Sequence, residues 1–162
     1  TGGSIRIPAA LCGIVGFKPC PAVELPAPLR PRKITNPDAP RIEHYIEVEL
    51  AGKPQPVVPI LFSNRDLYDA KSGKNFFAYL TFKLMAVERQ QNAWRPKLAD
   101  GQPRLLDVSE VKNFHEQIGL NTGYIIHPEE LLADNFVLMV NQKRDLPSPE
   151  IVEKMRRLLA KP

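Results

Sequence analysis

Seven of the chain's 17 prolines fall between positions 19 and 40. Proline fixes φ and has no backbone N–H, so this stretch cannot form a continuous helix or a central strand. We expect residues 21–40 to run extended over the surface as a polyproline-like linker. The prolines therefore mark the main boundary in the chain, between residues 1–20 and a domain at 41–162.

Composition limits the classes of protein to which the chain can belong. Its 162 residues are 43% hydrophobic and 25% charged, which suits one globular domain with a real core. The net charge of +4 includes no run of five like charges, which argues against a nucleic-acid partner. No apolar run approaches the roughly 18 residues that span a bilayer, so no membrane partner is expected.

The two cysteines and the first residue bear on cellular location. Cys12 and Cys20 make neither a disulfide framework nor a metal knuckle, so a reducing, cytoplasmic location is the default. The chain begins at Thr1 without a methionine, and we expect its true N-terminus to lie upstream. A signal peptide upstream stays open.

Strand patterns dominate the first part of the domain. Residues 42–50 alternate apolar and polar side chains, as a half-buried strand does. Residues 57–62 predict a second short strand, at a sheet edge because of Pro59. Alternation over residues 80–86 predicts another strand, and Asp100-Gly101 predicts a hairpin turn.

Helix patterns dominate the second part. Ser109 is expected to cap a helix that ends at Gly119, Pro128 to open a second after His127, and Pro149 a third after Ser148. Two apolar stripes follow the last two openings: Leu131, Leu132, Phe136, Met139 and Val140, then Ile151, Val152, Met155, Leu158 and Leu159. The sequence therefore predicts an α+β domain, with an antiparallel sheet at about residues 41–107, three helices after it, and an irregular Pro-rich N-terminal segment.

Residues 1–19, TGGSIRIPAALCGIVGFKP, have a glycine-rich start and an apolar continuation. Gly2 and Gly3 let backbone N–H groups approach a ligand closely, and such groups can form an oxyanion hole. Ser4 supplies a hydroxyl that a nearby base can turn into a nucleophile. This run resembles the core motif of the amidase-signature serine hydrolases, which hydrolyse amides or transfer ammonia from glutamine.

The resemblance assigns roles only within this short segment. It implies that Ser4 is the acylated nucleophile and that the backbone of Thr1, Gly2 and Gly3 belongs to the oxyanion hole. In the family, the base system is a lysine and a second serine in a cis peptide, and both lie upstream of the matching run. The pattern also departs at Cys20, where the family usually has Thr or Ser. We therefore expect this chain to be inactive as an amidase on its own.

Residues 121–136, NTGYIIHPEELLADNF, carry a second pattern. Glu130 and Asp134 are four residues apart and share one helix face. Acidic residues in a first helical turn commonly complement the helix dipole, which is the plainer interpretation. Residues 42–160 also resemble, more weakly, the C-terminal part of a bacterial HExxH zinc metallopeptidase of the Glu-ligand type. That resemblance implies that Glu130 is a zinc ligand, that Asp134 supports one, and that His127 lines the site.

The histidines do not complete such a zinc site. A zinc peptidase needs two histidines at i and i+4 with a Glu between them, and the chain has only His44, His115 and His127. His115 is expected to face solvent and His44 to be a core or edge residue. No cofactor is expected in this chain, and zinc only if the missing HExxH segment were present. A helix that brought Glu130 beside His44 or His115 would weaken that expectation.

Three functional interpretations stay open. The first is a truncated or chimeric hydrolase, a fusion of the two fragments near Cys20-Pro21, which predicts that residues 1–20 pack poorly on the rest. The second is a non-catalytic binding or assembly domain, which predicts a contiguous exposed apolar groove. The third is an amidase or amidotransferase fragment that needs a partner chain, such as the missing remainder of a hydrolase, to supply its base.

Overall fold

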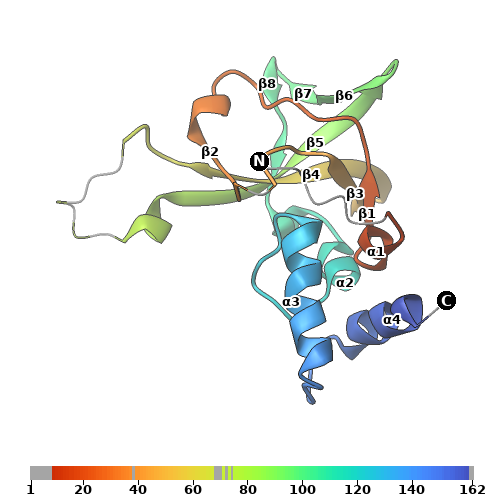
Figure 1. Cartoon of the computed structure of the whole chain (residues 1–162). Coiled ribbons are helices and arrows are strands. Elements are labelled where there is room, and N and C mark those ends of the chain that lie inside the picture. The colour runs from red at the N-terminus through yellow and green to blue at the C-terminus, as the bar shows by residue number, and fades with distance from the viewer. Residues whose placement is uncertain (1–8, 38, 68–70, 72, 74, 161–162) are drawn as a thin grey trace.

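The computed structural model describes residues 9–37, 39–67, 71, 73 and 75–160. Within these residues seven strands form one antiparallel sheet, a further hairpin forms a second, and the α-helices lie on one side of the main sheet (Figure 1). The predicted α+β class is confirmed. Thr1, Gly2, Gly3 and Ser4 lie outside the described residues.

The strands follow each other across the sheet largely in chain order. The main sheet contains β1 (Phe17–Pro19), β2 (Lys33–Ile34), β3 (His44–Leu50), β4 (Lys53–Ser63), β5 (Leu80–Gln90), β6 (Ala93–Pro96) and β9 (Leu105–Leu106). Its order is β1-β3-β4-β5-β6, with β2 also paired to β4 and β9 to β5. β7 (Leu98–Ala99) and β8 (Gln102–Pro103) form the hairpin predicted at Asp100-Gly101, where both residues have the positive φ that a tight hairpin turn requires.

The described residues contain four α-helices, two of which begin at the predicted prolines. They are α1 (Ala9–Ile14), α2 (Phe114–Ile118), α3 (Pro128–Val140) and α4 (Pro149–Leu159), with 3-10 turns η1 (Arg30–Arg32), η3 (Phe76–Tyr79) and η4 (Val108–Glu110). Gly119 ends α2 at a φ of 75°, and Pro128 and Pro149 open their helices as expected. Ser109 does not cap α2, because it lies inside η4 and Asn113 precedes the helix instead.

The described half of the amidase-like segment, residues 9–19, is built into the fold. Cys12, Val15 and Phe17 are each at most 1% exposed and belong to the larger hydrophobic core. β1 pairs antiparallel with β3, which places Phe17 opposite Ile46. The prediction that residues 1–20 pack poorly is therefore wrong for residues 9–19, because an apolar helix and strand bury better in the core than in water.

Gly16 shows how closely this segment fits its neighbours. It joins α1 to β1 with a φ of +78°, a backbone conformation that residues other than glycine rarely adopt. A Cβ at Gly16 would lie 2.5 Å from Oε1 of Gln117 on α2. The Gln117 amide in turn donates to the backbone carbonyls of Glu47 and Asn113, at 2.8 and 3.1 Å. A bulkier residue at position 16 would have to displace this bonded side chain.

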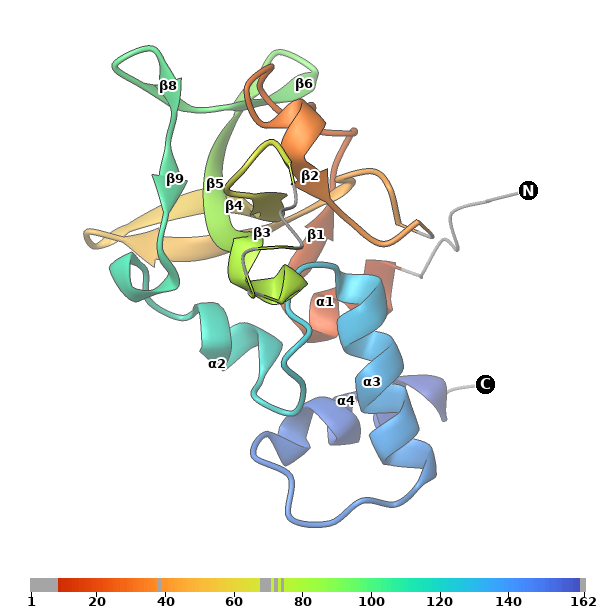
Figure 2. The same cartoon turned by 90° about the vertical axis from the view of Figure 1, so that its left-hand side faces the viewer.

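The two faces of the sheet are covered by different parts of the chain. The larger core lies between the sheet and the helices, whereas the Pro-rich stretch lies on the opposite side (Figures 1 and 2). Val23, Leu25 and Leu29 from that stretch are at most 8% exposed and pack in a second core with Val58 and Met85 of the sheet. Residues 21–40 thus supply buried apolar side chains, a 3-10 turn and the short β2, and are more than a surface wrap.

The edge position predicted for the strand with Pro59 is wrong, because β4 lies between β3 and β5. On one side β4 pairs with β3 at residues 53–57 and with β2 at residues 61–62. Pro59 falls between these two paired stretches, so on that side the position has no strand partner. Proline is tolerated at such a point because the missing N–H leaves no ladder bond unmade there.

The helices bury less of their apolar stripes than predicted. Leu131 and Leu132 of α3 and Ile151, Val152 and Met155 of α4 are buried, which confirms that part of each stripe. Phe136 and Val140 of α3 are instead 46% and 59% exposed, and Leu159 of α4 is 49% exposed. These three side chains lie in the second halves of their helices.

Candidate functional site

The first turn of α3 gathers titratable side chains beside the sheet and the Pro-rich stretch. His127 precedes the helix, Pro128 opens it with a pre-set φ, and Glu129 and Glu130 follow in the turn where negative charge suits the helix dipole. This is the place where the sequence predicts zinc-site residues. Each of these three titratable side chains contacts another segment of the chain.

His127 is held by two hydroxyl groups. Its Nε2 lies 3.0 Å from Thr35 Oγ1, and its Nδ1 lies 3.4 Å from the Tyr124 hydroxyl. Thr35 donates its single hydroxyl hydrogen to the Ala39 carbonyl at 2.9 Å, so the hydroxyl must accept from His127 Nε2–H. Nδ1 is then the acceptor for Tyr124, and both ring nitrogens of a neutral imidazole have partners.

Electrostatics keep this imidazole uncharged. His127 is 7% exposed, and burial, followed by the positive charge of Lys33, lowers its pKa from 6.5 to about 4. A neutral histidine is the form that binds metals, but a metal would have to displace one of the two hydroxyl partners. At neutral pH the uncharged His127 connects the Pro-rich stretch to the start of α3 through its hydrogen bond with Thr35.

Glu130 and Asp134 also have partners within the chain. Asn36 in the Pro-rich stretch donates its side-chain amide to Glu130. The Thr122 hydroxyl donates to Asp134, and Thr122 Oγ1 also accepts from the backbone N–H of Tyr124 at 3.0 Å. Glu130 thus connects α3 to the Pro-rich stretch, whereas Asp134 connects α3 to the loop that precedes it. The zinc roles of Glu130, Asp134 and His127 stay predictions.

Sequence patterns missed a second set of contacts made by Glu129. Its Oε1 lies 3.5 Å from Nδ1 of His44 on β3, and Nε2 of the same ring lies 3.6 Å from Cys12 Sγ on α1. It is Glu129, one residue before the predicted ligand Glu130, that comes beside His44. The apolar-face position of His44 was the only sequence signal for this group, because its three residues lie far apart in the chain.

The order thiol, imidazole, carboxylate is that of a cysteine nucleophile with its base and orienting acid. Burial, followed by the charge of Glu129, raises the pKa of Cys12 to about 11, so the thiol is neutral at pH 7. Cys12 is also 0% exposed, which leaves no path for a substrate in this conformation. In this conformation the group connects α1, β3 and α3.

Among the residues that the structure describes, no group of three or more His, Cys, Asp and Glu side chains is arranged to hold a metal ion. His115, on α2, is exposed, as expected from the sequence. The nucleophile predicted at Ser4 and the oxyanion backbone predicted at Thr1, Gly2 and Gly3 fall outside the described residues, so these roles stay predictions.

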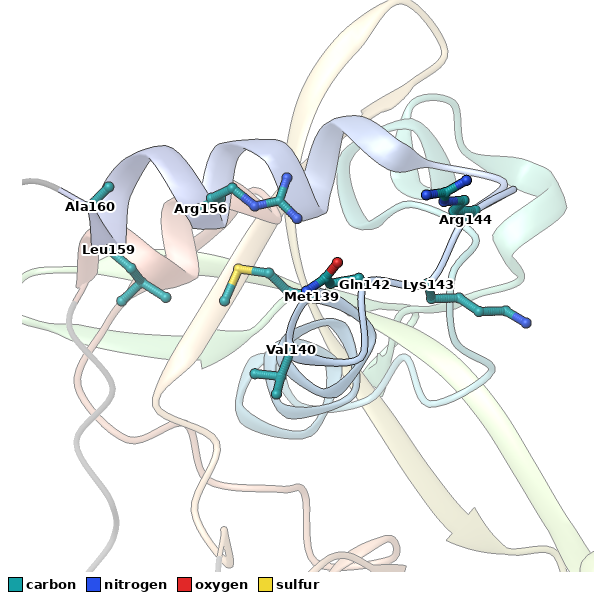
Figure 3. A pocket seen from close by; sticks show the side chains of 8 residues that line it. All are labelled: Met139, Val140, Gln142, Lys143, Arg144, Arg156, Leu159 and Ala160. Carbon is teal, nitrogen blue, oxygen red and sulfur yellow. The ribbon is translucent and has the colours of Figure 1, made fainter.

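A hollow lies at the opposite end of α3, between α3 and α4 (Figure 3). Its volume is about 720 Å³, and its lining combines apolar and cationic side chains: Met139, Val140, Lys143, Arg144, Arg156 and Leu159, together with Gln142 and Ala160. Figure 3 shows Met139 beneath α4, between the two helices, with Arg156 and Leu159 coming from α4 above it. We call this feature the α3–α4 groove.

Comparison with known proteins identifies one family likeness, at the N-terminus. A family model described as Amidase matches residues 1–23. This match supports the resemblance of the first segment to the amidase-signature hydrolases. No curated protein and no solved structure matches the chain significantly. Among the described residues, no helix combines the length and the apolar character that a membrane span needs.

Proposed function

We propose that this chain acts as a non-catalytic binding or assembly domain and that the α3–α4 groove is its contact surface. The observation that carries the proposal is a hollow between two helices that is lined in part by apolar side chains and is open to solvent. Val140 and Leu159, which line it, are 59% and 49% exposed. Exposed apolar side chains that gather around a hollow are typical of surfaces that bind other molecules.

The amidase-like segment has a structural use in this proposal. Its helix and strand supply Cys12, Val15 and Phe17 to the core, and its cysteine contacts His44. In this proposal the segment contributes to the folded core rather than to catalysis. The integration of residues 9–19 also counts against a simple joining artefact, which would add a segment with no complementary surface on the rest of the domain.

Binding of a neutral apolar dye tests the groove directly. We expect Nile red to gain fluorescence in the presence of the protein, because it can enter an apolar hollow without an ionic contribution. Val140→Gln and Leu159→Gln each should reduce that gain several-fold. Val137→Gln is the matched control, because Val137 lies on the same helix and is 56% exposed but does not line the groove. A dye signal that all three variants reduce equally, or no signal at all, would contradict the proposal.

A second function is favoured by the family match over residues 1–23. In this interpretation, the chain is an amidase or amidotransferase fragment, and another chain supplies the lysine and serine that activate Ser4. A serine alone is a weak nucleophile at neutral pH and needs a base within hydrogen-bond reach. The fragment should then react with a fluorophosphonate probe only when an amidase core that contains those residues is added, and Ser4→Ala should abolish labelling. Lack of labelling in the presence of that core would eliminate this function.

A further inference from the structure

The charges around the α3–α4 groove are of one sign. Lys143, Arg144 and Arg156 line it, and no acidic side chain does. Among the described residues none of these three cations forms an ion pair, whereas Arg157, the next residue on α4, lies 3.4 Å from Glu153. Arg156, unlike Arg157, is therefore available to an anionic partner.

Compensation of helix dipoles explains only part of this arrangement. Cations favour the C-terminal turn of a helix, and Arg156 in the last turn of α4 serves that purpose. The effect fades within that turn, and α3 ends at Val140, before Lys143 and Arg144. The dipole of α3 therefore does not explain why both Lys143 and Arg144 lie beside the groove.

We propose that the α3–α4 groove binds an acidic amphipathic helix of a partner protein. This inference rests on the proposed binding function and adds the chemistry of the partner. Met139, Val140 and Leu159 would contact the apolar side of the incoming helix, as in other helix-in-groove complexes. Lys143, Arg144 and Arg156 would face acidic residues at its borders, where opposite charges select the partner and speed its association.

The shape of the site favours a helix over a membrane surface. The apolar side chains line a hollow between two helices, and Met139 lies beneath α4 rather than on an outer face (Figure 3). Proteins that lie on membranes present an apolar face that projects into the lipid. A narrow segment with protruding apolar side chains can enter the hollow instead.

The test uses a synthetic peptide of about eighteen residues that forms a helix, with leucines at i, i+3, i+4 and i+7 and glutamates on its borders. Binding to the full chain is followed by fluorescence anisotropy. We expect the peptide to bind at least roughly tenfold more tightly than its counterpart with lysines in place of the glutamates, and to weaken as salt is added. Arg156→Glu should weaken binding roughly tenfold or more.

Lys154→Glu is the matched control, because Lys154 is an exposed cation on the same helix that does not line the groove. It makes the same change in net charge and should alter affinity less than about twofold. Circular dichroism and thermal melting check that both variants fold. Equal losses from Arg156→Glu and Lys154→Glu, or equal affinity for the acidic and basic peptides, would overturn the inference.

The remaining outcomes separate this inference from the proposed function. If Nile red enters the groove but the acidic peptide does not bind, the acidic partner is wrong and the binding function stands. If neither binds, both proposals fail. If vesicles of phosphatidylcholine and phosphatidylserine bind in an Arg156-dependent way while the peptide does not, the surface serves a membrane and the inference is overturned.

Discussion

The two ends of helix α3 use their side chains in opposite ways. At the N-terminal end, His127, Glu129 and Glu130 contact Thr35, His44 and Asn36, all from segments distant in sequence. At the C-terminal end, Val140 is more than half exposed, and Lys143 and Arg144 have no ion-pair partner among the described residues. The first end holds the fold together, and the second presents a surface.

The comparison of the two ends of α3 shows that a sequence motif need not mark a binding site. The acidic and histidine pattern at the start of α3 resembles a zinc-site helix, yet its polar groups bond to neighbouring segments. The end of α3 resembles no motif, yet Val140 there is more than half exposed, and among the described residues Lys143 and Arg144 form no ion pair. Polar groups that already have partners mainly stabilise, whereas a ligand gains most from groups that do not.

The largest expected effect comes from breaking the larger core, to which Leu131 and Leu132 of α3 and Phe17 of β1 belong. Phe17→Ala removes a side chain that is 1% exposed, and we expect it to lower the free energy of unfolding by about 3–5 kcal/mol. Lys18→Ala is the control, because this neighbour on β1 has a side chain that is 53% exposed. Urea denaturation measures both. A loss below about 1 kcal/mol for Phe17→Ala would mean that residues 9–19 are not part of the folded core.

The second prediction concerns the pH dependence of stability at His127. Its folded-state pKa of about 4 lies below the ordinary value of 6.5, so folding favours the neutral form. This contribution is complete above pH 6.5 and is lost as the pH falls toward 4. The loss should be on the order of 3 kcal/mol.

Urea denaturation of the wild type and of His127→Gln at a series of pH values measures this loss. The variant should show a smaller fall in stability between pH 6.5 and 4, whatever its stability at pH 7. His115→Gln is the control, because His115 is exposed. An unchanged pH profile in His127→Gln would show that folding does not lower the pKa of His127.

The smallest expected effect is at the C-terminal end. Val140→Gln and Leu159→Gln should each change the free energy of unfolding by less than about 0.5 kcal/mol, because both side chains are about half exposed and a polar replacement stays solvated. The same variants should lose dye binding. Destabilisation of more than about 2 kcal/mol would show that the groove is part of the core and would remove the contrast between the two ends.

Local signals account for what could be predicted of the fold. Pro128, Pro149 and Gly119 mark helix ends because their backbone constraints act at the residue itself. The Asp100-Gly101 turn was found for the same reason. The interior position of Pro59 and the exposure of Phe136 were missed because each depends on which strand or helix lies alongside.

The candidate sites divide in the same way. The sequence drew attention to His127 and Glu130 through their spacing, but their partners Thr35 and Asn36 come from the Pro-rich stretch. No spacing rule connects Cys12 with His44 and Glu129. Nor does a rule connect the ends of α3 and α4, because the groove exists only where the two helices pack side by side.

The sequence by itself determined the α+β class, the helix starts at the two prolines and the likeness of residues 1–23 to amidases, because each follows from residues close together in the chain. The tertiary structure alone decided that residues 9–19 belong to the core, that His44 lies between Cys12 and Glu129, and that Val140 and Leu159 remain open to solvent. Burial and pairing depend on which surfaces meet, and periodicity along one segment does not specify its neighbour.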